Sequence, residues 1–181
     1  LVIVSTIPTG VIGILFKDTV ELAGTMLVVP GICLLITSVF LVIADYADEG
    51  TKRPREASYV NAGLIGVAQG IATMPGLSRS GTTISFGMLR GFERSFAVKF
   101  SFLLSIPAVL GANLVSIIKV FSTGVEWSYV PMYLVGVACA FVSGYFAIYF
   151  LRLVVQRGKF GGFCYYCWGA GLVTLLLSLI S

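Results

Sequence analysis

The sequence predicts an all-α, polytopic membrane protein, on the strength of three observations. Its 181 residues are 57% hydrophobic and only 11% charged, whereas ordinary soluble domains carry about 25% charged residues. Several uncharged runs approach or exceed the roughly 20 apolar residues that a helix needs to cross a bilayer. Charged residues are concentrated between these runs. The main exception is an arginine among hydroxyl side chains in the middle of the chain.

The apolar runs define the expected elements. The chain opens within an apolar run without Met or signal-peptide features, so we expect residues 1–16 to be part of a span and the chain to be N-terminally incomplete. A charged segment at 45–56 is expected to be a cytoplasmic loop. Complete spans are expected at 22–44, 100–118, 127–151 and 160–181.

The basic residues indicate an orientation. The formal charge of +4 is not gathered in one run or on one face, so we do not expect nucleic acid as a partner. If the expected spans alternate across the membrane, nine basic residues lie on one side and only Lys17 and Lys119 on the other. The positive-inside rule makes the first side cytoplasmic. Its basic residues are Lys52, Arg53, Arg55, Arg90, Arg94, Lys99, Arg152, Arg157 and Lys159.

Inside the expected spans, the glycines, cysteines and prolines are expected to shape and pack the helices. Small residues at helical spacing, as in Gly66/Gly70, Gly87/Gly91 and Ala140/Gly144, are typical of close helix packing. The prolines at 30 and 107 are expected to kink their helices. No histidine is present, and no residues resemble a zinc ligand set. The four cysteines are expected to pack between helices and are Cys33, Cys139, Cys164 and Cys167.

The stretch PGLSRSGTT, residues 75–83, is a polar interruption in a mostly apolar sequence. Pro75 and Gly76 should end a helix that begins near Tyr59, and Ser78 or Ser80 can cap a second helix. That second helix is too short to span before Arg90. We therefore expect residues 57–93 to form a re-entrant hairpin whose tip carries Arg79.

An arginine at membrane depth costs about 2.5–3.5 kcal/mol on insertion scales and is tolerated beside water, a counter-charge or a bound anion. A helix N-terminus and hydroxyl donors surround Arg79, and its guanidinium fork suits phosphate. The sequence therefore predicts a phosphate-binding cradle, with glycines that let backbone approach the ligand. Its predicted residues are Gly76, Ser78, Arg79, Ser80, Gly81, Thr82 and Thr83.

Two structural alternatives stay open. Arg79 could pair with a buried glutamate while the serines merely cap the helix, although no acidic residue lies within an expected span. Gln69 either lines the same cavity or hydrogen-bonds between helices, and the sequence favours neither. Asn61 is expected to be structural.

The motif resembles that of the undecaprenyl pyrophosphate phosphatase family, also known for bacitracin resistance. Every specified position of its P-G-x-S-R-S-x-x-T pattern is matched, by Pro75, Gly76, Ser78, Arg79, Ser80 and Thr83. The likeness extends through residues 7–18, 84–91 and 99–112, so it covers essentially the whole chain.

The resemblance implies an inverted-repeat fold with re-entrant hairpins and a cavity open to the extracytoplasmic side of the cell membrane. It implies dephosphorylation of undecaprenyl pyrophosphate to undecaprenyl phosphate, which recycles the lipid carrier for cell-wall synthesis, with a divalent cation such as Mg²⁺. Arg79 and Ser78 would be catalytic, and Ser80 and Thr83 would bind phosphate. No metal ligand is expected within the 181 residues.

The family's glutamate-rich motif, with its serine and histidine, is not found in this sequence. We therefore expect the metal ligands in a preceding segment and the 181 residues alone to be inactive. The alternative function is a lipid-phosphate flippase or anion transporter, because broken helices also hold anions in transporters. The expected partners are undecaprenyl pyrophosphate and the lipid bilayer, and a homodimer stays open.

Overall fold

The computed structural model describes residues 1–47, 50–123, 127–156 and 162–180. Apart from an isolated β-bridge between Lys52 and Phe92, the regular elements within these residues are helices, which confirms the predicted all-helical class. A short 3-10 helix covers Trp127–Tyr129. The α-helices are α1 (Val2–Leu15), α2 (Lys17–Gly24), α3 (Val28–Tyr46), α4 (Tyr59–Ile71), α5 (Arg79–Leu89), α6 (Arg94–Thr123), α7 (Val130–Gln156) and α8 (Phe163–Ile180).

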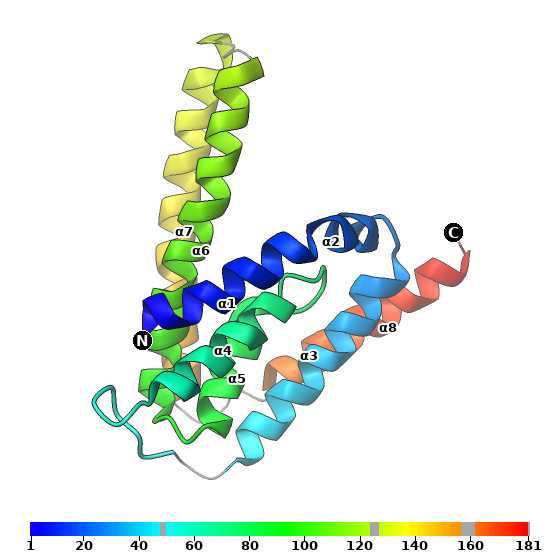
Figure 1. Ribbon diagram of the computed structural model, residues 1–181. Coiled ribbons are helices and arrows are strands. Elements are labelled where there is room, and N and C mark those ends of the chain that lie inside the picture. The colour runs from blue at the N-terminus through cyan, green and yellow to red at the C-terminus, as the bar shows by residue number, and fades with distance from the viewer. Residues whose placement is uncertain (48–49, 124–126, 157–161, 181) are drawn as a thin grey trace.

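The helices form three neighbouring groups (Figure 1). Helices α6 and α7 make a long hairpin that projects from one side of the molecule. Helices α1, α4 and α5 lie in the middle, where α1 packs on α4 and α5 packs on both α4 and α6. Helices α3 and α8 run side by side on the other flank, and α3 also contacts α5. Helix α5 is therefore the central element.

Four helices of the described residues are long and apolar enough to cross a membrane: α3, α6 up to Ile118, α7 up to Val154, and α8. Helices α1 and α2 also pass this test as a pair, although they are bent by 65° at their junction. These helices support the predicted multi-pass membrane protein. The inverted repeat stays a prediction.

The complete span expected at 22–44 begins later than the sequence suggested. Residues 22–24 end α2, and the Thr25 hydroxyl donates to the Leu22 carbonyl oxygen at 2.7 Å, which closes that helix. Helix α3 starts at Val28, so Pro30 lies in its first turn. A first-turn proline disrupts no helical hydrogen bond, and the kink expected there has no cause. Pro107 does lie inside α6.

Hydroxyl groups join α1 to α4. The Ser5 hydroxyl donates to the Ala62 carbonyl oxygen at 2.6 Å, and the Thr9 hydroxyl donates to the Gly66 carbonyl oxygen at 2.8 Å. A Cβ on Gly66 would collide with the Ser5 backbone, and one on Gly70 would lie 2.7 Å from the Ile12 Cβ. The expected close packing at this pair of glycines is confirmed.

Other glycines depart from the expectation. A Cβ on Gly144 would meet no heavy atom within 4 Å, so no close packing occurs there in the described part of the chain. Between α3 and α8, by contrast, Gly31 and Gly171 lie close together: a Cβ on Gly171 would lie 3.1 Å from the Gly31 carbonyl oxygen. Because the two glycines are far apart in sequence, spacing within one helix gives no sign of this contact.

Helices α4 and α5 form a hairpin. The Ser58 hydroxyl caps α4 by accepting from the Asn61 N–H at 3.2 Å. The Arg90 Nε donates to the Asn61 side-chain oxygen at 3.0 Å, which joins the start of α4 to the end of α5. At 1.5 Å per residue, the helices measure only about 20 Å and about 17 Å, shorter than the roughly 30 Å hydrocarbon layer. Their re-entry into a membrane stays a prediction.

Candidate functional site

The turn between α4 and α5 is shaped by Gly76. Its φ is +86°, a left-handed conformation that favours glycine. A Cβ at this position would collide with the Pro30 carbonyl oxygen. Gly76 therefore lets the turn pack directly against the start of α3. The sequence predicted that this glycine would admit a phosphate, but the group that approaches it is the α3 backbone.

Ser78 holds the start of α5. Its hydroxyl accepts from the Gly81 N–H at 3.1 Å, and its own N–H donates to the Thr37 hydroxyl of α3 at 3.0 Å. A Cβ on Gly81 would lie 2.8 Å from the Ser78 Oγ, so glycine leaves room for the cap. The structure thus gives Ser78, Gly76 and Gly81 structural contacts, and none of the three lines the cavity described next.

A cavity of about 250 Å³ opens beside the first turn of α5, where α4, α5 and α6 meet. Most of its lining residues carry polar side chains although the surrounding helices are apolar. Helix α4 contributes Gln69 and α5 contributes Arg79, Ser80 and Thr83. Helix α6 contributes three residues that the sequence did not single out: Ser101, Phe102 and Ser105.

Arg79 is the charged residue of this cavity. The ion pairs within the described ranges join Lys17 to Glu21, Arg53 to Glu93 and Arg94 to Asp45, and none involves Arg79. No described residue accepts a hydrogen bond from its guanidinium either. The buried glutamate that would give Arg79 a purely structural role is therefore not found among the residues that the structure describes.

Gln69 carries a second unsatisfied group. Its side chain is only 1% exposed, and neither its amide nitrogen nor its oxygen has a partner among the described residues. A buried polar group without a partner costs roughly 1–3 kcal/mol, and each such group in a native structure needs an explanation. Since Gln69 and Arg79 line the same cavity, a bound polar ligand would satisfy both.

Thr83 connects α5 to α6. Its hydroxyl is hydrogen-bonded to the Ser101 hydroxyl and also reaches the Arg79 carbonyl oxygen at 2.9 Å. The Ser105 hydroxyl donates to the Phe102 carbonyl oxygen at 2.7 Å. These bonds fix the cavity wall but already occupy the hydroxyl protons. The lining groups without a partner among the described residues are therefore the guanidinium of Arg79, the amide of Gln69 and the hydroxyl of Ser80.

The cavity does not offer a cation site. No carboxylate lines it, and no group of three or more Asp, Glu, His or Cys in the described ranges is arranged to hold a metal. Guanidinium, amide and hydroxyl donors suit an anion, whereas Mg²⁺ is usually bound through carboxylates and substrate phosphates. The residues that line this cavity therefore do not fit a divalent cation.

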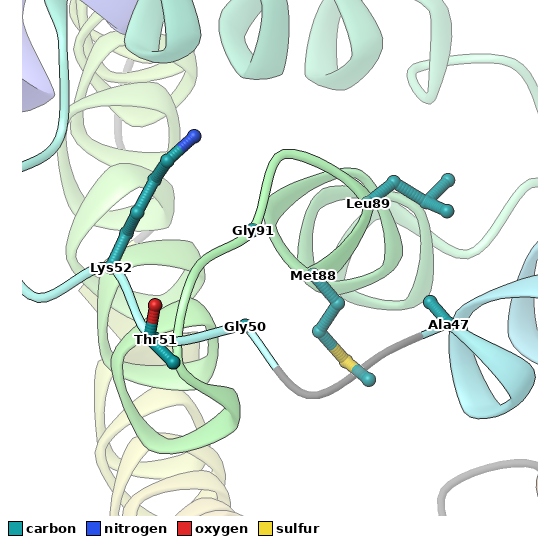
Figure 2. A pocket seen from close by; sticks show the side chains of 7 residues that line it. All are labelled: Ala47, Gly50, Thr51, Lys52, Met88, Leu89 and Gly91. Carbon is teal, nitrogen blue, oxygen red and sulfur yellow. The ribbon is translucent and has the colours of Figure 1, made fainter.

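A larger hollow of about 480 Å³ lies at the other end of α5, around the turn that follows it (Figure 2). Its lining brings together none of the predicted site residues. The Lys52 ammonium donates to the Arg90 carbonyl oxygen at 2.9 Å. The Lys52 N–H donates to the Gly91 carbonyl oxygen at 3.0 Å. These bonds fasten the loop to the turn, so this hollow is structural.

The apolar helices place the chain among multi-pass membrane proteins, and the cavity lies where three of its helices meet. A family model described as "Bacitracin resistance protein BacA" matches residues 1–173. The chain belongs to this family, which confirms the predicted resemblance. Together with the relatives described next, it confirms the predicted class of enzyme, a phosphatase.

Curated relatives named undecaprenyl-diphosphatase cover almost the entire chain. The relative from Halothermothrix orenii is 41% identical over 98% of this chain and 69% of its own length. That from Alkaliphilus metalliredigens is 39% identical over 99% of this chain and 66% of its own length. The relative from Methanothermobacter thermautotrophicus is 43% identical over 99% of this chain and its own full length. The chain thus spans about two thirds of the first two relatives and all of the third.

Proposed function

We propose that this chain forms the phosphate-binding wall of an enzyme that converts undecaprenyl pyrophosphate to undecaprenyl phosphate. The net reaction consumes one water, breaks the bridging P–O bond and releases inorganic phosphate. One observation carries the proposal: Arg79 and Gln69 line one cavity, and among the described residues neither side chain has a partner and no carboxylate lines that cavity. Four to five helices of the described residues are long and apolar enough to cross a membrane, as an enzyme that acts on a lipid-linked substrate requires.

In this proposal the residues divide the work between binding and positioning. The guanidinium of Arg79 binds the pyrophosphate oxygens and stabilises the charge that develops during transfer. Ser80 and Gln69 donate further hydrogen bonds. Thr83 holds α5 against α6, and Ser78 orients the first turn of α5, whose N–H groups favour an anion. Ser78 therefore acts through its cap, and the attacking group is left unassigned.

Two further parts of the proposal rest on the resemblance. A divalent cation such as Mg²⁺ takes part, held by ligands that the cavity residues do not provide. The 181 residues alone release no phosphate, because the glutamates and histidine of the family's other motif are not among them. Phosphate release by the isolated chain would contradict the second statement without touching the role of Arg79.

We propose that the loop at 50–56 faces the cytoplasm and that the cavity opens to the extracytoplasmic side of the cell membrane. The support is the distribution of basic residues: Lys52 contacts Arg90 just after the end of α5, and Arg94 begins α6, whereas the cavity lies beside the first turn of α5. Positive residues favour the cytoplasmic side. This orientation agrees with removal of phosphate outside the cytoplasm.

The experiment is to incubate the detergent-solubilised protein that carries this chain with undecaprenyl pyrophosphate and to measure inorganic phosphate. Release of one phosphate per lipid, with undecaprenyl phosphate as the other product, supports the proposal. Movement of intact pyrophosphate lipid across a vesicle membrane without phosphate release would support a flippase or transporter and overturn it.

A further inference from the structure

A second polar feature lies between α6 and α7, in a groove of about 350 Å³. Lys99 reaches it from α6 and Arg152 from α7, so two cations from different helices meet at one groove. Ser95 adds a hydroxyl. The rest of the lining is apolar and consists of Val98, Phe102, Leu103 and Ile148.

The two cations have no counter-charge among the described residues. Neither Lys99 nor Arg152 forms an ion pair or hydrogen bond with a residue that the structure describes. The acidic group closest along the chain, Glu93, accepts from the Ser95 hydroxyl at 2.8 Å and faces Arg53 at 3.7 Å. Asp45 is paired with Arg94 at 3.3 Å. Two unpaired positive charges above an apolar wall match an amphiphile with an anionic head.

We propose that this groove binds an anionic phospholipid of the surrounding membrane. Its phosphate lies between Lys99 and Arg152, and an acyl chain follows the apolar wall formed by both helices. Basic pockets between transmembrane helices on the cytoplasmic side bind anionic head groups. Lys99 lies in α6 near Arg94, at the end of the molecule that we propose faces the cytoplasm. The groove shares only Phe102 with the cavity that contains Arg79, so the two sites are separate and this proposal does not depend on phosphatase activity.

The test measures the thermal unfolding midpoint of the chain in zwitterionic detergent micelles during titration with phosphatidylglycerol or phosphatidylcholine. We expect phosphatidylglycerol to raise the midpoint in a saturable manner and phosphatidylcholine to have little effect. The double variant K99Q/R152Q should need at least about tenfold more phosphatidylglycerol for the same shift of the midpoint, since each basic residue contributes appreciably to anionic-lipid binding. The control K17Q/R55Q has the same net charge as K99Q/R152Q but changes residues outside the groove. It should respond to phosphatidylglycerol like the native chain.

A second variant separates loss of binding from loss of folding. Ile148→Trp keeps both cations and fills the groove, so it should weaken the phosphatidylglycerol effect, whereas its midpoint in the same detergent micelles with phosphatidylcholine should stay near the native value. Equal weakening by K99Q/R152Q and K17Q/R55Q would indicate bulk electrostatics and overturn the proposal. It would also be overturned if a prenyl monophosphate, but not phosphatidylglycerol, depended on the two cations.

Discussion

At the scale of single residues, the cavity separates side chains that are already satisfied from those that are not. Ser78 and Thr83 have protein partners on α5, α3 and α6. Arg79 and Gln69 have none within the described ranges. This difference distinguishes residues that build the cavity from residues that are free to bind a ligand, although all but Gln69 belong to one short motif.

Gln69 provides the first prediction. Replacing an unpartnered buried amide with a hydrocarbon of similar size removes a desolvation cost, so Gln69→Leu should keep or raise the unfolding midpoint. The same change removes a ligand contact and should lower kcat/KM for the pyrophosphate by about fivefold. Differential scanning fluorimetry and the phosphate-release assay measure the two effects. A lower midpoint with unchanged kcat/KM would mean that Gln69 is a packing residue.

The two motif serines should behave differently. Ser78→Ala removes a helix cap and should lower the free energy of unfolding by about 1 kcal/mol. Ser80→Ala removes one neutral hydroxyl without a protein partner, so stability should be unchanged while turnover falls a few-fold. Chemical denaturation and phosphate release, measured on both variants, distinguish these roles. A stable Ser78→Ala protein without activity would restore Ser78 as a catalytic residue.

At the scale of helices, much of the site-bearing hairpin could be predicted from sequence. Pro75 and Gly76 mark its turn, Ser78 its cap and Arg90 its end. Ser101 and Ser105 could not be assigned to the cavity, because the face that α6 turns toward α5 depends on their packing. Their spacing of four residues, one helical turn, was the available signal. The start of α3 was placed too early because apolar composition runs unbroken through Gly24 and Thr25.

The contact between α1 and α4 gives a prediction with an internal control. Gly66→Ala places a methyl group against the Ser5 backbone, where rigid helices cannot yield easily, so the unfolding midpoint should fall clearly. Gly63 lies in the same helix, and a Cβ at that position would have no heavy atom within 4 Å. Gly63→Ala should therefore keep or raise the midpoint, since alanine favours helix. Equal effects of the two substitutions would contradict the α1–α4 packing.

At the scale of the whole molecule, the proposed orientation places the loop at 50–56 in the cytoplasm and the opening of the cavity on the opposite side. In a cysteine-free background, a membrane-impermeant thiol reagent applied to intact cells should label Ser128→Cys, whereas Thr51→Cys should react only after the cytoplasmic side is exposed. Cysteines at Ala57 and Glu93 should share the face of Thr51 if α4 and α5 are re-entrant. Labelling of Ala57→Cys and Glu93→Cys from opposite faces would show that this region spans the membrane.

In the proposed function Arg79 stabilises phosphate charge in the cavity. The measurement that tests this role is phosphate release by Arg79→Lys and Arg79→Ala in the protein that carries this chain, alongside the unfolding midpoint. Arg79→Lys keeps the charge but loses the two-pronged geometry, and we expect turnover to fall about a hundred- to a thousand-fold. Arg79→Ala should lose more, and both variants should insert and unfold like the native protein. Near-normal turnover in Arg79→Ala, or a loss of activity explained entirely by misfolding, would contradict this role of Arg79.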